Sequence, residues 1–101
     1  MKFGLTDKEL KQLQNKVIQP LRDRGARVWV FGSRARGDHK KFSDLDILFE
    51  VPIDRELEPG FLFEIKSEME DSNFPYKVDL VDSKSLAESY RAGVEAERVE
   101  A

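Results

Sequence analysis

Apolar residues near the start of the chain follow the spacing of one helix face. They recur every three or four positions, at Leu10, Leu13, Val17 and Leu21. The preceding residues 6–9, Thr-Asp-Lys-Glu, have the form of a capping box, in which the Thr and Glu side chains bond the unpaired N–H groups of a helix start. Gly25 predicts the end of this helix. Pro20 predicts a kink or an earlier end, because proline lacks an N–H and its ring clashes with the preceding turn.

Three short segments have the patterns of β-strands. Residues 28–31 are apolar and either β-branched or aromatic, which is typical of a brief buried strand, and we expect Trp29 to lie in the core. Residues 44–51 alternate between a core face with Leu45, Ile47, Phe49 and Val51 and an opposite face with Asp44, Asp46, Leu48 and Glu50. Residues 77–81 predict a third strand, with Asp79 on the face opposite Val78 and Leu80.

Two further helices are predicted in the second half of the chain. Pro59 suits the first turn of a helix whose apolar stripe is Leu62, Ile65 and Met69, flanked by Phe61 and Phe63. Residues 73–75, Asn-Phe-Pro, end this helix. Ser85 and Glu88 have capping-box spacing at the start of a last helix, which carries Leu86 and Tyr90.

This order of elements predicts an α/β (α+β) fold, with a small mixed sheet of three or four strands and flanking helices. Its 101 residues allow one domain, spanning residues 1–101. Residues 95–101 are Glu-rich and are expected to form either a frayed tail or a short edge strand. No apolar run approaches the length of a membrane helix, and the start does not resemble a signal peptide. We therefore expect a soluble, cytoplasmic protein.

The amino-acid composition limits the kinds of catalytic and metal chemistry that are open to the protein. Without cysteine there is no disulfide, thiolate nucleophile or Cys-bound zinc, so carboxylates are the abundant reactive groups and any metal should be hard and oxygen-bound. The net charge is +4 over residues 1–50 and −7 over residues 51–101. A long nucleic acid is therefore disfavoured, and the acidic half is a candidate docking face for a basic partner.

The basic excess is concentrated in one glycine-bearing loop. Its cations are Arg34, Arg36, Lys40 and Lys41, with His39 beside them. Such a loop can attract a small polyanion, although a solvated surface loop is the alternative. His39 has no His or Cys partner nearby, and we expect it to face solvent.

The flanks of this loop carry the candidate chemistry. Gly32 lets backbone N–H groups approach a phosphate closely, and Ser33 adds a hydroxyl. Asp44 and Asp46 stand at i and i+2 on a strand and point to the same side. If the third strand pairs beside the second, Asp79 joins them. Because these acids would repel a phosphate, a phosphate site here requires divalent metal, and the pattern suits two-metal attack of a hydroxyl on a nucleoside triphosphate.

These residues resemble a known family. Gly32-Ser33, ten intervening residues and Asp44-Leu45-Asp46 are similar to the G-S-x10-D-x-D signature of polymerase-β-type nucleotidyltransferases. The fuller runs at residues 31–37, 43–47 and 76–81 resemble minimal nucleotidyltransferase (MNT) domains, many of which are antitoxins encoded beside a HEPN-domain toxin. The resemblance implies a polymerase-β-like nucleotidyltransferase fold. Related domains often finish in an apolar strand, which the Glu-rich end of this chain does not resemble.

The resemblance also implies roles for individual residues. The catalytic, metal-binding carboxylates would be Asp44, Asp46 and Asp79, holding two Mg²⁺ ions. The triphosphate of ATP would be held by Gly32, Ser33, Arg34 and Arg36. For the two arginines, a surface salt bridge to Asp38 or to a partner is the alternative. Two solvent-facing acids on an exposed strand are the alternative for Asp44 and Asp46.

The implied activity is transfer of AMP from ATP to a hydroxyl. Three strands and three helices use up the chain, so we expect the acceptor to come from another protein, and the resemblance implies a tyrosine of a HEPN toxin in a hetero-oligomer. Two alternatives stay open, namely a binding-only antitoxin without chemistry and transfer to a small-molecule hydroxyl.

Overall fold

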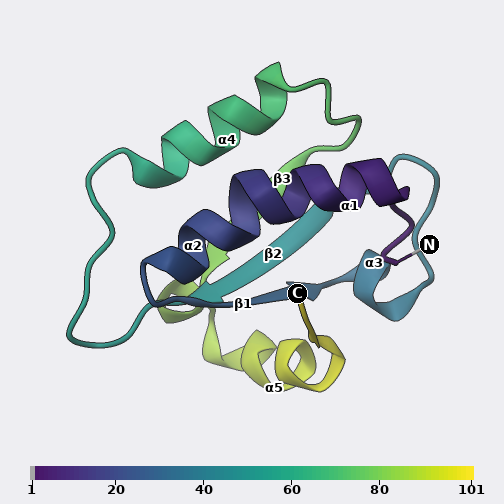
Figure 1. Ribbon diagram of the computed structural model, residues 1–101. Coiled ribbons are helices and arrows are strands. Elements are labelled where there is room, and N and C mark those ends of the chain that lie inside the picture. The colour runs from purple at the N-terminus through teal and green to yellow at the C-terminus, as the bar shows by residue number, and fades with distance from the viewer. Residues whose placement is uncertain (1) are drawn as a thin grey trace.

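A computed structural model describes residues 2–101. These residues form a four-stranded mixed sheet with flanking helices (Figure 1). The strands are β1 (Arg27–Phe31), β2 (Leu45–Glu50), β3 (Val78–Asp82) and β4 (Val99–Glu100), in the order β3-β2-β1-β4. β1 is antiparallel to β2 and β4, whereas β2 and β3 are parallel. The predicted fold class is therefore confirmed, and residues 99–100 form the edge strand that was one of two options for the tail.

The first helical stretch runs from α1 (Asp7–Leu13) through a π-helical segment, η1 (Gln14–Ile18), to α2 (Gln19–Asp23). The predicted capping box is present, with Glu9 N donating to Thr6 Oγ1 at 3.2 Å and Thr6 N to Glu9 Oε1 at 2.9 Å. Of the two options predicted at Pro20, a kink or an earlier end, the earlier end is wrong, because the chain stays helical to Asp23. In the widened turn before Pro20, the N–H of Gln19 bonds the carbonyl of Gln14, and this is where the helix accommodates a residue that cannot donate a regular bond.

The later helices differ from the sequence prediction at their starts. They are α3 (Ser33–Arg36), α4 (Phe61–Asp71), the 3₁₀ turn η2 (Ser83–Ser85) and α5 (Glu88–Glu97). α4 begins after Gly60, whose φ of 82° is left-handed, so Pro59 lies before the helix rather than in its first turn. The predicted cap at Ser85 is wrong, because Asp82 accepts a bond from Lys84 N at 2.9 Å and starts a separate 3₁₀ turn, and α5 begins without a side-chain cap.

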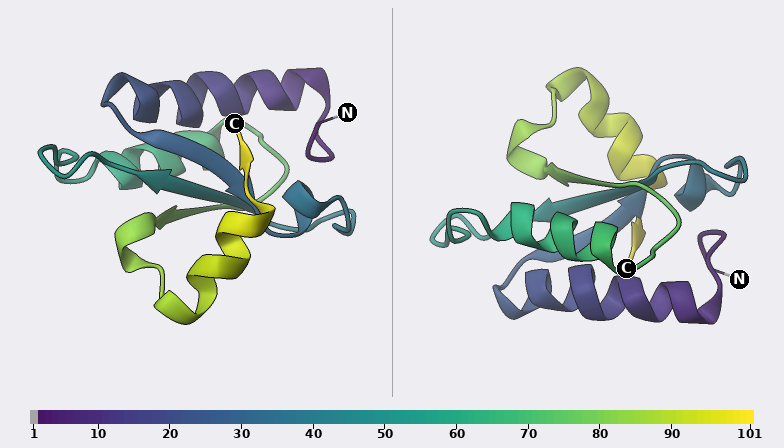
Figure 2. Two further views of the ribbon diagram at one scale, coloured as in Figure 1. Left: turned by 90° about the horizontal axis from the view of Figure 1, so that it is seen from below. Right: turned by 90° about the horizontal axis from the view of Figure 1, so that it is seen from above.

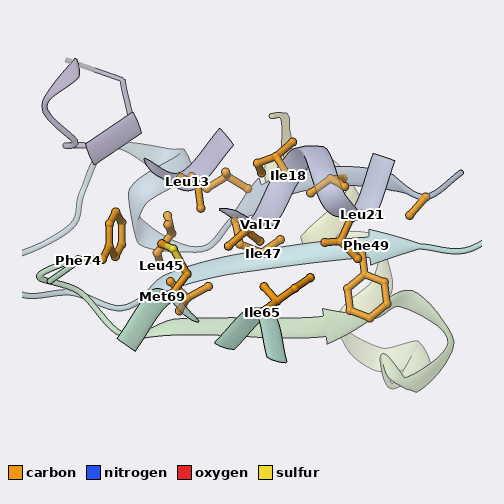
Figure 3. Close-up of a cluster of buried hydrophobic side chains, with 14 of the residues drawn as sticks. Leu13, Val17, Ile18, Leu21, Leu45, Ile47, Phe49, Ile65, Met69 and Phe74 are labelled. Carbon is orange, nitrogen blue, oxygen red and sulfur yellow. The ribbon is translucent and has the colours of Figure 1, made fainter. Parts of the chain in front are cut away.

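The main core lies between the sheet and the helices α1, α2 and α4, which cover one face (Figures 1 and 2). Side chains from these helices meet the predicted core face of β2, as Figure 3 shows for Leu13, Val17, Ile18, Leu21, Leu45, Ile47, Phe49, Ile65 and Met69. On α4 the fully buried positions are Phe61, Ile65 and Met69, whereas Phe63 is 75% exposed.

The opposite sheet face is covered by α5 (Figure 2). Trp29, Leu48 and Val94 form a smaller buried cluster there, which confirms the expected core position of Trp29. The Arg98 guanidinium lies 4.0 Å from the Trp29 ring centroid and joins the end of α5 to the sheet. Among the described residues, no helix is long and apolar enough to cross a membrane.

Candidate active site

Two of the predicted acids lie side by side on neighbouring strands. The parallel register of β2 and β3 pairs Asp46 with Asp79, at a strand separation of about 4.8 Å. Asp46 shares its side of β2 with Leu48, so it lies on the sheet face that α5 covers. Asp44 stands just before β2 and is exposed. The register therefore brings Asp46 and Asp79 together, whereas Asp44 lies outside the paired residues.

Gly32 directly follows β1, at the end of the sheet where Asp46 lies. β1 ends at Phe31, which pairs with Asp46, so the next residue lies directly beside the Asp46 carboxylate. A Cβ atom on Gly32 would overlap Oδ2 of Asp46, and the φ of Gly32 is +78°. Both observations explain why glycine occupies this position, because only glycine adopts such a φ without strain and lets the backbone approach the carboxylate.

The carboxylates affect one another. Burial raises the pKa of Asp46, and the nearby charges of Asp79, Asp44 and Glu97 raise it further, whereas Arg36 opposes them. Lys77 Nζ lies 3.7 Å from Asp79 Oδ1, at the exposed edge. The site therefore carries an excess of negative charge on hard oxygen donors, which is the donor set that Mg²⁺ prefers. In residues 2–101, however, no three His, Asp or Glu side chains already surround a common point.

Arg34 bonds backbone carbonyls of two separate segments. Its side chain is buried, at 2% exposure, and its guanidinium donates to the Ser43 carbonyl at 2.9 Å and the Phe3 carbonyl at 2.9 Å. It also stacks 3.9 Å from the Tyr76 ring centroid. These contacts fasten the residues before Asp44 to the start of the chain. These bonds use Nε and Nη1 of the guanidinium, and its contact with nucleotide stays a prediction.

The other residues of the loop lie closer to solvent. Ser33 opens α3, and its carbonyl accepts bonds from the N–H groups of Gly37 and Asp38 at 2.9 and 3.2 Å. Arg36 is 45% exposed and bonds Asp38 at 3.1 Å, which is the salt bridge considered as an alternative to nucleotide binding. His39 is half-buried beside Gly4 rather than solvent-facing, because the first turn of the chain folds over it.

Sequence reasoning missed one residue of the site, Glu97. Its Oε1 accepts the Gly32 N–H at 3.1 Å and its Oε2 accepts from Arg36 Nη1 at 2.8 Å. Its negative charge also helps to raise the pKa of Asp46. No local pattern marks Glu97, which stands in a run of acidic tail residues; only the return of α5 and β4 to the sheet brings it here.

Comparison with known proteins shows the family to which the chain belongs. Residues 10–100 match the family model described as Nucleotidyltransferase domain. The chain therefore belongs to the nucleotidyltransferase domain family, and Gly32, Asp46, Asp79 and Glu97 all fall within the matched region.

More specific similarity points to one branch of this family. The chain is 41% identical over 68 residues to a Haemophilus influenzae protein named "Probable protein adenylyltransferase MntA", an alignment that covers 63% of this chain and 54% of that protein. The chain thus spans about half the length of this curated relative.

Two solved structures have the same fold over most of the chain. A minimal nucleotidyltransferase superposes with a TM-score of 0.69 and 30% identity, covering 100% of this chain and 97% of the other. A toxin-antitoxin complex solved with AMP-PNP superposes with a TM-score of 0.64 and 26% identity, covering 86% of this chain and 70% of the other. The resemblance to minimal nucleotidyltransferases is thereby confirmed.

Proposed function

We propose that the protein is a Mg²⁺-dependent nucleotidyltransferase that moves AMP from ATP onto a hydroxyl group of a partner protein. The observation that carries this proposal is the pairing of Asp46 with Asp79, directly beside the backbone of Gly32. It brings two acids and the Gly32 backbone together at one end of the sheet. Family membership and the AMP-PNP-bound neighbour support the same reaction.

Two Mg²⁺ ions would be held by Asp44, Asp46 and Asp79. When bound, they neutralise the phosphate oxygens and lower the pKa of the attacking hydroxyl. The excess negative charge that raises the Asp46 pKa fits this role, because a divalent cation removes the repulsion between the carboxylates. Asp44, which is exposed just before β2, would supply the third carboxylate.

The protein residues position the reactants. Gly32 N–H and the Ser33 hydroxyl donate to oxygens of the triphosphate, and Arg36 contributes a positive charge beside them. Asp79 holds the acceptor hydroxyl in line with the α-phosphorus and takes its proton on a carboxylate oxygen. The hydroxyl oxygen bonds to the α-phosphorus, the bond from that phosphorus to the bridging oxygen breaks, and pyrophosphate leaves. Arg34 holds the loop before Asp44 in place through its hydrogen bond to the Ser43 carbonyl.

The acceptor we propose is a tyrosine hydroxyl of a HEPN-domain toxin, with which the chain would form a hetero-oligomer in the cytoplasm. The relative named as a protein adenylyltransferase and the toxin-antitoxin neighbour support a protein acceptor. AMP on such a tyrosine would silence the toxin.

The test is transfer of labelled AMP from ATP to the protein encoded beside this chain, in the presence of Mg²⁺. We expect the partner to gain an adenylyl group, the mass of AMP less water, on a tyrosine with the wild-type protein and not with Asp46→Asn. No transfer by the wild type would refute the proposed reaction. Inhibition of the toxin by Asp46→Asn without a covalent mark would instead support a binding-only antitoxin.

A further inference from the structure

Glu97 uses both of its carboxylate oxygens at the site. Oε1 accepts the Gly32 N–H at 3.1 Å and Oε2 accepts from Arg36 at 2.8 Å. The Glu97 side chain is 24% exposed, so these bonds are partly shielded from water. The carboxylate therefore bridges the backbone and the side chain of the loop that follows β1.

These donors are the ones that the proposed function assigns to the triphosphate. A carboxylate oxygen and a phosphate oxygen both accept charge-assisted hydrogen bonds and both carry negative charge, so they compete for the same N–H groups. Gly32 has a single backbone N–H, and it cannot serve both acceptors at full strength.

We propose that Glu97 is an intramolecular competitor for the pyrophosphate portion of the nucleotide. This inference rests on the proposed function. Glu97 occupies Gly32 N–H and Arg36 before ATP binds and swings aside as the β- and γ-phosphates arrive. It returns to the same donors as pyrophosphate leaves. Glu97 thereby weakens the binding of ATP and of pyrophosphate, and favours release of the product.

The surrounding contacts indicate that the side chain moves rather than the backbone. On its C-terminal side, Arg98 N bonds the Val94 carbonyl at 2.9 Å and its guanidinium stacks on Trp29. Val99 then pairs with Val30 in the sheet. The backbone at Glu97 is therefore fixed, whereas its partly exposed side chain has rotatable bonds and solvent on one side.

The experiment measures the affinities of wild type, Glu97→Gln and Glu97→Ala for Mg²⁺-ATP, Mg²⁺-pyrophosphate and AMP by calorimetry. We expect both variants to bind ATP and pyrophosphate about three- to tenfold more tightly, because a partly exposed charged acceptor has been removed from their donors. AMP lacks the β- and γ-phosphates, so its affinity should change by less than about twofold.

Two matched variants separate competition from general charge repulsion. Glu95→Gln removes a charge from an exposed position of the same helix. Asp38→Asn removes an acid that also bonds Arg36, at 3.1 Å, but is not a partner of Gly32. We expect Glu95→Gln and Asp38→Asn to tighten ATP binding less than Glu97→Gln does, because neither change frees the Gly32 N–H.

Several results would overturn the inference. Equal tightening in Asp38→Asn or Glu95→Gln would leave repulsion as the cause, and equal tightening of AMP would contradict competition at the pyrophosphate position. Weaker ATP binding in Glu97→Gln would make Glu97 a metal ligand or a support for Arg36. If wild type binds ATP and Glu97→Gln binds it equally well, only the role of Glu97 falls. If no variant binds ATP, the proposed function falls with it.

Discussion

Gly32 lies against Asp46 so closely that a methyl group on residue 32 would overlap the Asp46 carboxylate. The contact joins the end of β1 to the middle strand of the three that surround the site. It makes the position of a predicted phosphate donor depend on the position of a predicted metal ligand. Replacing either residue should therefore disturb the other.

Gly32→Ala should abolish nucleotide binding, because Asp46 has to rotate away from the new methyl group. Gly37→Ala is a matched control, since Gly37 also has a left-handed φ, +86°, but a Cβ there meets nothing within 4 Å. Both variants should lose about 1–2 kcal/mol of stability through backbone strain. Thermal unfolding and ATP calorimetry would measure this, and retention of ATP binding by Gly32→Ala would contradict the assignment.

Asp46→Asn and Asp79→Asn should each lower the rate of AMP transfer by about 100-fold or more. Asn at position 46 weakens metal binding, and Asn at position 79 cannot take the acceptor proton. Asp54→Asn, an exposed acid in the loop after β2, should leave the rate unchanged. Single-turnover transfer to the partner protein is the measurement. A wild-type rate in Asp79→Asn would remove Asp79 from the mechanism.

Asp46→Asn should stabilise the metal-free protein. The pKa of Asp46 is raised in the folded state, so its ionised form destabilises the fold above that pKa, and this penalty disappears below the unfolded value of 3.8. We expect a Tm rise of about 2–4 °C at pH 7, the scale of about 0.5 kcal/mol for a half-buried group in a domain of this size.

The comparison should be made in EDTA across pH. The difference in Tm between Asp46→Asn and wild type should shrink as the pH falls toward 3.8. Mg²⁺ should then raise the Tm of wild type more than that of the variant. A variant less stable than wild type at pH 7 without metal would show that Asp46 supports the fold.

Arg34→Lys should destabilise the protein by about 2 kcal/mol, because lysine cannot bond the Phe3 and Ser43 carbonyls together while stacking on Tyr76. Arg36→Lys should cost less, since its pair with Asp38 is exposed and its pair with Glu97 is only partly shielded. Denaturant unfolding distinguishes the two. An Arg34→Lys protein of unchanged stability but weakened ATP binding would instead make Arg34 a nucleotide ligand, as the sequence predicts.

Much of the fold follows from local pattern. The alternation in β2 assigns Leu45, Ile47 and Phe49 to the core and places Asp46 on the opposite face, as the structure confirms. The capping box at Thr6 was also predictable, because its two bonds form within four consecutive residues. The pairing of Asp46 with Asp79 needed one further assumption, namely that β3 lies beside β2.

Other features depend on packing that the sequence does not display. Arg34 and Arg36 stand two positions apart in one basic loop, yet the first is buried under the start of the chain and the second is exposed. Their different environments come from Phe3 and Glu97, which are distant in sequence. At Ser85 the capping pattern was present, but the 3₁₀ turn held by Asp82 competed successfully for the same backbone.

Gly32 and Glu97 are in contact although they stand 65 positions apart in the sequence. The parts of the site are therefore synthesised at different times. During synthesis Gly32 and Arg36 emerge early, whereas Glu97, whose carboxylate bonds both, emerges only after β2, α4 and β3. Contacts of such long range close late in folding, because a large loop must first be ordered. A nascent chain that has not yet reached residue 97 therefore leaves the Gly32 N–H and the Arg36 guanidinium without this carboxylate, and completion of α5 brings it to them.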